Sequence, residues 1–177
     1  MRKAGFGPDN RLRANYLIRS TAAGSYRAVA AALQQMLALI YVDISIVPTD
    51  VQVFYKQIQE HDFDMSQPGW QADFNDASNF LDLFRTSGGN NWGAYSNPAF
   101  DKMLAAAQSD PDIQSRGMKL AEAEAILLND QVVMPLFFWV SGNLVRPYVK
   151  GWGANPMDKH RSRWISIDEK ARAALFA

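Results

Sequence analysis

One acidic residue stands between two large aromatic residues near the middle of the chain. Asp73 lies between Trp70 and Phe74, in a segment interrupted by Pro68 and Gly69. A carboxylate beside aromatic faces can hold a cationic group, because the ion pair and the ring quadrupole both attract positive charge. The same residues could form the aromatic end of a strand followed by solvated acids. The local pattern therefore leaves a cation-binding site and a plain surface loop both open.

The surrounding window is acidic. Between Lys56 and Arg85 there is no other lysine or arginine, whereas acidic residues occur at Glu60, Asp62, Asp64, Asp73, Asp76 and Asp82. His61 with Asp62 and Asp64 could form one corner of a metal site, since imidazole and carboxylates bind divalent ions. No second histidine lies near them in the sequence, which argues against a metal.

Catalytic readings find little support. Asp73 and Asp76 could act as the acid and base of a hydrolase, but no nucleophile motif accompanies them. Gly88 and Gly89 lack the lysine and the helix context of a phosphate loop. The chain has no cysteine, which excludes disulfides, thiolate metal ligands and cysteine nucleophiles. The sequence predicts a protein that is not an enzyme and needs no cofactor, with a small α/β hydrolase or metal enzyme as the alternative.

Composition sets broad limits. The 177 residues are enough for one domain, and Lys+Arg 18 balances Asp+Glu 18. No global charge therefore favours nucleic acid or an anionic membrane. The most apolar run, residues 28–42, is interrupted by Gln34 and Gln35 and is too short to cross a bilayer.

The elements that would position Asp73 begin with a strand, a helix and a second strand. Residues 13–19 read as a strand, and apolar residues at helical spacing predict a helix over 25–40. Alternation over 42–46 predicts a half-buried strand that Pro48 stops. This order is typical of a parallel crossover. Thr49 and Gln52 then form a capping box that opens a helix to about residue 61.

The aromatic segment itself is expected on a strand over 63–72, followed by a short helix over 78–86. Asn97-Pro98 and Asp110-Pro111 predict the starts of two further helices, the second ending near Asn129. Their inward side chains are expected to be Phe100, Met103, Leu104 and Ala107, then Ile113, Leu120, Ala123 and Leu127. The remaining expectations are an apolar strand over 132–140, a last strand over 163–167 and a frayed tail over 171–177.

Several motifs in this order point to one family. They are GWQADF at 69–74, SNFL at 78–81, NN at 90–91, YSNPAFDK at 95–102, AEAE at 121–124, VMPL at 133–136 and LVRPYVKGW at 144–152. Together they resemble the ligand lobe of bacterial extracytoplasmic oligopeptide- and dipeptide-binding proteins, the solute-binding components of ABC importers. The resemblance covers nearly the whole chain, which would form only the C-terminal part of such a protein.

The resemblance implies an α/β fold, a periplasmic-binding-protein-like (type II) lobe with a mixed sheet flanked by helices. Residues 1–145 would be the C-terminal ligand-binding lobe, incomplete at its N-terminus. Residues 146–177 would cross back toward the absent N-terminal lobe. The chain shows no signal peptide, so Met1 would lie inside a longer precursor, and a periplasmic or extracytoplasmic location is implied. One departure is Tyr41, where the family usually turns with a glycine.

The resemblance also assigns the site. In peptide-binding members the carboxylate at the position of Asp73 holds the peptide's N-terminal ammonium, and Gly69 and Trp70 lie beside it. Asn90 and Asn91 stand on a loop that reaches the same cavity.

Three further positions complete the expected pocket. Trp139 falls where an aromatic residue lines the cleft, and Trp92 would narrow one side-chain pocket. Gln67 stands where some relatives have an arginine that helps neutralise the peptide's C-terminal carboxylate. Glutamine carries no charge, which puts that anchor in doubt.

The implied function is capture of peptides and their delivery to an ABC permease in the inner membrane. The implied partners are the peptide, the permease and the missing N-terminal lobe of the same protein, without nucleic acid. A non-peptide cation, such as a nickel chelate, haem or an opine-like compound, is the alternative ligand.

Overall fold

A three-stranded parallel sheet organises the N-terminal part of the chain in the computed structural model, which describes residues 1–20, 25–138, 140–155 and 157–175. The strand order is β2-β1-β3. The elements are η1 (Arg2–Ala4), β1 (Leu12–Arg19), α1 (Ser25–Ala38), β2 (Val42–Thr49), α2 (Val51–Gln59) and β3 (Met65–Ser66). Both β2 and β3 run parallel to β1, which confirms the predicted strand–helix–strand unit.

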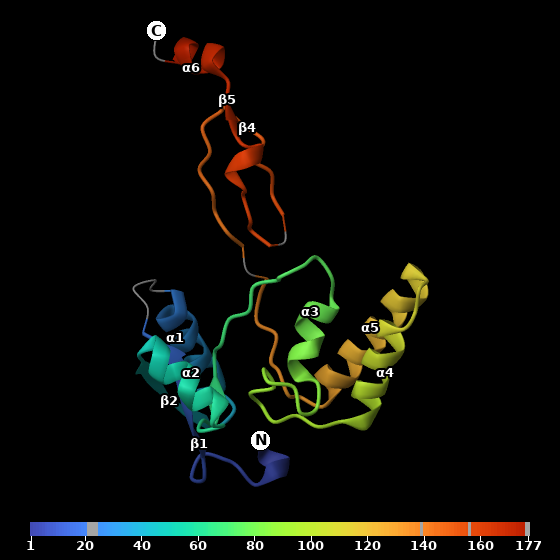
Figure 1. The fold of residues 1–177 in the computed structure, drawn as a ribbon. Coiled ribbons are helices and arrows are strands. Elements are labelled where there is room, and N and C mark those ends of the chain that lie inside the picture. The colour runs from blue at the N-terminus through green and yellow to red at the C-terminus, as the bar shows by residue number, and fades with distance from the viewer. Residues whose placement is uncertain (21–24, 139, 156, 176–177) are drawn as a thin grey trace.

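A group of helices follows the sheet and lies on the other side of the molecule (Figure 1). It consists of α3 (Ser78–Leu81), η2 (Asp82–Phe84), α4 (Pro98–Gln108) and α5 (Ile113–Asn129). Asn97 caps α4 as predicted, because its Oδ1 accepts hydrogen bonds from Ala99 N at 2.8 Å and Phe100 N at 3.3 Å. The loop between η2 and α4 carries Trp92 back toward the sheet unit.

The apolar core is divided among three clusters. The helical group is held by a cluster of Leu81, Tyr95, Phe100, Leu104, Ala107, Leu120, Ala123 and Leu127. One face of the sheet packs α1 through Tyr16, Ile18, Ala30, Leu33, Val42 and Ile44. The other face packs α2 through Leu17, Phe54 and Ile58, with Tyr55, Phe63 and Trp92 against them.

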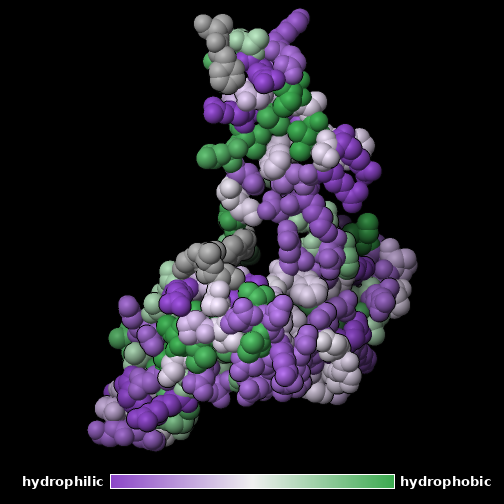
Figure 2. All heavy atoms as spheres, turned by 60° about the vertical axis from the view of Figure 1, so that its left-hand side comes forward, coloured by the Kyte–Doolittle hydropathy of each residue, from purple (hydrophilic) through white to green (hydrophobic). Residues whose placement is uncertain are grey.

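The C-terminal segment projects from this body (Figure 1). Its elements are β4 (Val149–Lys150), η3 (Ser162–Trp164), β5 (Ser166–Ile167) and α6 (Glu169–Leu175), with β4 and β5 antiparallel. No described residue beyond Leu127 is buried. Apolar side chains are visible on the surface of the projection in Figure 2.

Several predicted strands are shorter than expected or absent. Of 63–72 only Met65–Ser66 is a strand, and of 163–167 only Ser166–Ile167. The described residues of 132–140 form no strand, although the sequence is strongly apolar. A strand needs a neighbour for its backbone groups, and no described strand pairs with these residues. By contrast, β2 continues past Pro48 to Thr49, because it is an edge strand and such strands tolerate proline.

The helix starts also needed correction. Asp50, not Thr49, caps α2, since its side chain accepts from Gln52 N at 2.9 Å. Asp112 caps α5 through Ser115 N at 2.7 Å, so this helix begins after the Asp110-Pro111 pair.

Side-chain orientation and the C-terminus followed the predictions in part. Ile113 is 86% exposed, because it opens the first turn of α5, whereas the other predicted inward residues are buried or, for Met103, partly buried. The expected frayed tail is instead the helix α6 up to Leu175.

Tyr41 supports the expectation of a tight turn before β2. Its φ of 68° lies in the left-handed region that favours glycine. Its hydroxyl accepts a hydrogen bond from Arg2 Nη2 at 2.8 Å, and the Arg2 and Arg11 guanidinium groups lie 5.7 and 5.8 Å from its ring centre.

Among the described residues, no helix combines the length and the apolarity needed to cross a membrane.

Candidate ligand-binding site

A row of aromatic side chains joins the sheet unit to the loop that follows β3. The ring centres of Tyr55 and Trp92 are 5.9 Å apart, and those of Trp92 and Trp70 are 6.4 Å apart, both in edge-on geometry. Tyr55 comes from α2, Trp70 from the segment after β3 and Trp92 from the loop before α4. Trp92 therefore lies between the two other rings, and Trp70, at 37% exposed, remains open to solvent.

Asn79 on α3 fixes Trp70 and Asp73 next to each other. Its Oδ1 accepts a hydrogen bond from Trp70 Nε1 at 3.0 Å and one from Asp73 N at 3.3 Å. Asn79 is only 7% exposed, so this acceptor is shielded from water. The sequence predicted no role for Asn79 beyond its place in a motif.

The Asp73 carboxylate has no ion-pair partner in the described part of the chain. Its neighbours differ. Asp76 pairs with Arg116 at 2.5 Å, and Asp82 pairs with Arg85 at 2.7 Å. Hydrogen bonds from Arg116 and Ser78 hold the pKa of Asp76 well below its usual range. Asp76 is thus locked as a carboxylate, which argues against a proton-shuttling pair with Asp73.

The segment between β3 and Trp70 passes over the end of β1. Gln67 N donates to Leu17 O at 3.1 Å, and Gln67 Oε1 accepts from Tyr16 OH at 3.0 Å. Gly69 crosses Arg19 so closely that a Cβ at this position would lie 2.8 Å from Arg19 Nη2. A side chain at this position would force the Arg19 guanidinium group to move.

The two asparagines of the loop have different surroundings. Asn91 is 8% exposed, and its amide donates to Tyr95 O at 2.7 Å and accepts from Tyr95 N at 3.0 Å. This amide shapes the loop, so a ligand contact by Asn91 stays a prediction. Asn90 is exposed, and its backbone carbonyl oxygen accepts a hydrogen bond from Trp92 N at 2.9 Å. Trp139, also expected in the cleft, lies outside the described residues.

Arg19 is a charged neighbour of this region that the sequence reasoning missed. It ends β1, and its Nη1 donates to Tyr55 OH at 3.2 Å. A usable signal was present, because side chains at the carboxyl ends of parallel strands commonly line ligand sites in α/β folds.

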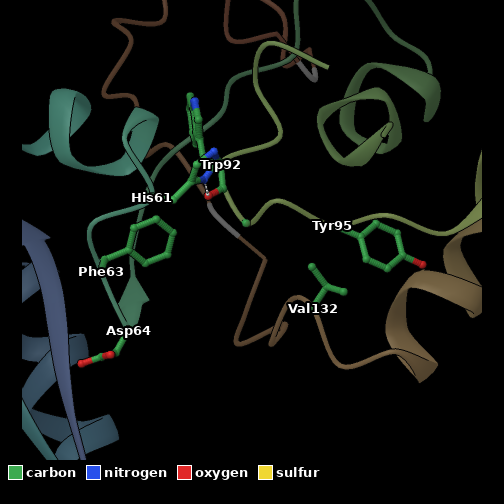
Figure 3. A pocket seen from close by; sticks show the side chains of 7 residues that line it. His61, Phe63, Asp64, Trp92, Tyr95 and Val132 are labelled. Carbon is green, nitrogen blue, oxygen red and sulfur yellow. Dashed lines mark hydrogen bonds between the residues drawn. The ribbon is translucent and has the colours of Figure 1, made fainter. Parts of the chain in front are cut away.

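A separate cavity of about 360 Å³ lies between the sheet unit and the helical group (Figure 3). Its lining consists of His61, Phe63, Asp64, Trp92, Gly93, Tyr95 and Val132. His61 Nδ1 lies 2.8 Å from Trp92 O, and Asp64 Oδ2 accepts from Asn15 N at 2.8 Å. Figure 3 shows these two side chains pointing apart, and the described residues hold no cluster suited to a metal ion. The metal alternative gains no support.

The chain is similar to known solute-binding proteins. A sequence profile described as bacterial extracellular solute-binding proteins, family 5 Middle, matches residues 1–92. The periplasmic oligopeptide-binding protein OppA of Haemophilus influenzae is 30% identical over 89% of this chain and 30% of its own length. The periplasmic murein peptide-binding protein MppA of Escherichia coli is 28% identical over 93% of this chain and 30% of its own length. The chain thus spans about 30% of the length of these relatives.

Solved structures confirm the predicted fold class. The murein tripeptide-binding protein MppA of Escherichia coli matches with a TM-score of 0.83 and 27% identity, over 94% of this chain and 33% of that one. Haemophilus influenzae OppA in complex with RPPGFSPFR matches with a TM-score of 0.79 and 28% identity, over 94% and 33%. The fold is that of a periplasmic binding protein, with parallel and antiparallel pairing in separate small sheets. The chain belongs to the bacterial extracellular solute-binding proteins of family 5.

Proposed function

We propose that the chain is part of the substrate-binding component of an ABC importer and that it holds peptides by their N-terminal ammonium group at Asp73. The observation that carries this proposal is the state of the acids in one short segment. Asp76 and Asp82 have arginine partners, whereas Asp73 is exposed, has no ion-pair partner among the described residues and is held beside Trp70 through its backbone N–H. A carboxylate next to an aromatic face suits an ammonium group.

Binding without catalysis fits the same residues. The relatives are named as peptide-binding proteins, and Asp76, the nearest second acid, is locked by Arg116. Delivery to a membrane permease, a periplasmic location and a second lobe that closes over the ligand are parts of this proposal, drawn from the family. In it, residues 1–145 form the ligand lobe and 146–177 reach toward the other lobe. The projection of the C-terminal segment supports that division.

The test replaces Asp73 by asparagine in the full-length gene product. Asp73→Asn should weaken binding of a tripeptide by about 2–5 kcal/mol in titration calorimetry, as for removing one partner of a desolvated charge pair. The matched control is Asp62→Asn, an exposed acid of the same window that should leave affinity unchanged.

The ligand provides a second control. An N-acetylated tripeptide should bind the parent weakly, because it has no ammonium group. Equal affinity of parent and Asp73→Asn for the free tripeptide would contradict the role of Asp73. Tight binding of a nickel chelate, haem or an opine-like compound, with no peptide binding, would replace the peptide by that ligand.

A further inference from the structure

His61 connects the end of α2 to the loop that carries Trp92. It follows Glu60, the C-terminal cap of the helix, and its Nδ1 lies 2.8 Å from Trp92 O. A carbonyl oxygen only accepts hydrogen bonds, so Nδ1 carries a hydrogen and donates it to this contact. In Figure 3 the Trp92 carbonyl faces His61, whereas the Trp92 ring extends away from Phe63 and Val132. His61 therefore holds Trp92 by its backbone and leaves the ring free to face the aromatic row.

The backbone of His61 has a conformation that few residues other than glycine adopt. Its φ of 58° lies in the left-handed region. A residue of this kind commonly ends a helix, and glycine or asparagine usually fills the place. Residues kept in such conformations cluster at functional sites. A glycine would end α2 equally well but could not reach Trp92, so the hydrogen bond is what the imidazole adds.

The Trp92 ring has no polar anchor of its own. Its Nε1 is buried and has no acceptor among the described residues. The Trp70 ring differs, because its Nε1 donates to Asn79 Oδ1 at 3.0 Å. The Trp92 ring is therefore placed by packing against Tyr55 and Trp70 and by the backbone that carries it. His61 fixes that backbone at its carbonyl group.

The loop of Trp92 is also held on the side of the helical group. The Asn91 amide bonds to the backbone of Tyr95, and Tyr95 OH donates to Asp130 Oδ2 at 2.6 Å. The bond from His61 ties the same loop to the sheet unit. The cavity of about 360 Å³ lies next to this bond, so the loop has space to move once the bond is removed.

We propose that His61 is a positioning residue for ligand selectivity: it keeps the Trp92 ring against Trp70 and so limits the size of the peptide side chain that fits near Asp73. This rests on the proposed function and adds a basis for its selectivity. A peptide held by its ammonium at Asp73 has its first two side chains nearest these rings. The ring centres are 6.4 Å apart, and consecutive α carbons of a peptide are about 3.8 Å apart.

Two substitutions of His61 separate the hydrogen bond from the backbone conformation. His61→Asn keeps both, because asparagine adopts positive φ and its amide nitrogen stands as many bonds from the backbone as Nδ1 does. His61→Gly keeps the conformation and removes the donor. Asp62→Gly, at the exposed neighbouring residue, is the matched control for the flexibility that a glycine adds.

The first test observes Trp92 directly. The full-length gene product is labelled with fluorotryptophan and followed by fluorine NMR, and Trp92→Phe identifies the Trp92 signal by its loss. This signal should shift or broaden in His61→Gly, because the ring loses its fixed place against Tyr55 and Trp70. It should keep the parent position in His61→Asn and in Asp62→Gly.

The second test measures selectivity. Titration calorimetry of the full-length gene product compares trialanine with two tripeptides, Phe-Ala-Ala and Ala-Phe-Ala. In His61→Gly at least one phenylalanine peptide should gain about 3- to 10-fold in affinity relative to trialanine, the range that the loss of one hydrogen bond allows. Trialanine itself should bind with nearly the parent affinity, since its small side chains do not need the space. His61→Asn and Asp62→Gly should keep the parent ratios.

The outcomes separate the two proposals. Parent ratios of affinity in His61→Gly overturn the inference. An equal loss for all three peptides also overturns it, because His61 would then be a structural residue. A change in His61→Asn as large as that in His61→Gly shows that the donor is not what matters, with the same result. No binding of any of the peptides by the parent removes the proposed function and the selectivity with it, and the fluorine signal then still decides whether His61 holds Trp92.

Discussion

Residues 12–130 and residues 131–175 differ in what their apolar side chains contact. All buried hydrophobic residues of the described chain lie between Tyr16 and Leu127. The second region contains Phe138, 96% exposed, and none of its described residues is buried. Both regions are rich in apolar residues, but only the first provides two surfaces that face each other. The second region therefore leaves large apolar side chains exposed, Phe138 and Leu144 above all.

The largest expected effect tests this contrast with one substitution at two positions. Phe100→Ala should lower the free energy of unfolding by about 3–5 kcal/mol, because Phe100 is fully buried and its removal leaves a cavity. Phe138→Ala should change it by less than about 0.5 kcal/mol. Urea denaturation of the 177-residue chain measures both. A comparable loss for Phe138→Ala would mean that the second region packs in solution, and the contrast would be lost.

Helix caps give a smaller effect of the same kind. Asn97 caps α4 inside the body, and Asp168 accepts from Ala171 N at 3.0 Å at the start of α6 in the projection. Asn97→Ala should cost about 1 kcal/mol of global stability. Asp168→Ala should leave global unfolding unchanged and only reduce the helical circular dichroism of α6. Equal destabilisation by the two variants would show that α6 unfolds together with the body.

We also expect the loss of folding stability at acid pH to arise in residues 12–130. Hydrogen bonds from Lys119, Ser115 and the Asp112 backbone lower the pKa of Asp110 to about 2. An unfolded aspartate titrates near pH 4, so this stabilisation is complete above about pH 4 and is lost as the pH falls toward about 2.

Asp110→Asn should therefore be less stable than the parent at neutral pH, and the difference should vanish near pH 2. The control is Glu169→Gln. Glu169 forms an exposed ion pair with Arg172 on α6, so this variant should have the same stability as the parent at every pH. Urea midpoints measured across this range decide the matter. A constant difference for Asp110→Asn would assign its effect to something other than the ionised carboxylate.

The same contrast explains how far the sequence could predict the structure. The parallel unit and the start of α4 followed from periodicity and from Asn97, because local patterns determine them. The strand over 132–140 failed because strand formation depends on a neighbour that no local pattern can supply. In the candidate site, Trp70 and Asp73 could be predicted together because they are close neighbours in the sequence. Arg19 was missed because its approach to Gly69 is a contact between distant segments.

The order of the core clusters along the chain has a consequence for how the protein folds. The buried residues of the sheet clusters lie within 16–58 and those of the helical cluster within 81–127, and Trp92, which packs against the sheet from the loop before α4, joins the two. Contacts of short sequence separation form quickly, and such units often open independently in the native state. We therefore expect amide hydrogen exchange to show two protected units, and ribosome-bound chains to bury the first while the second is still being synthesised.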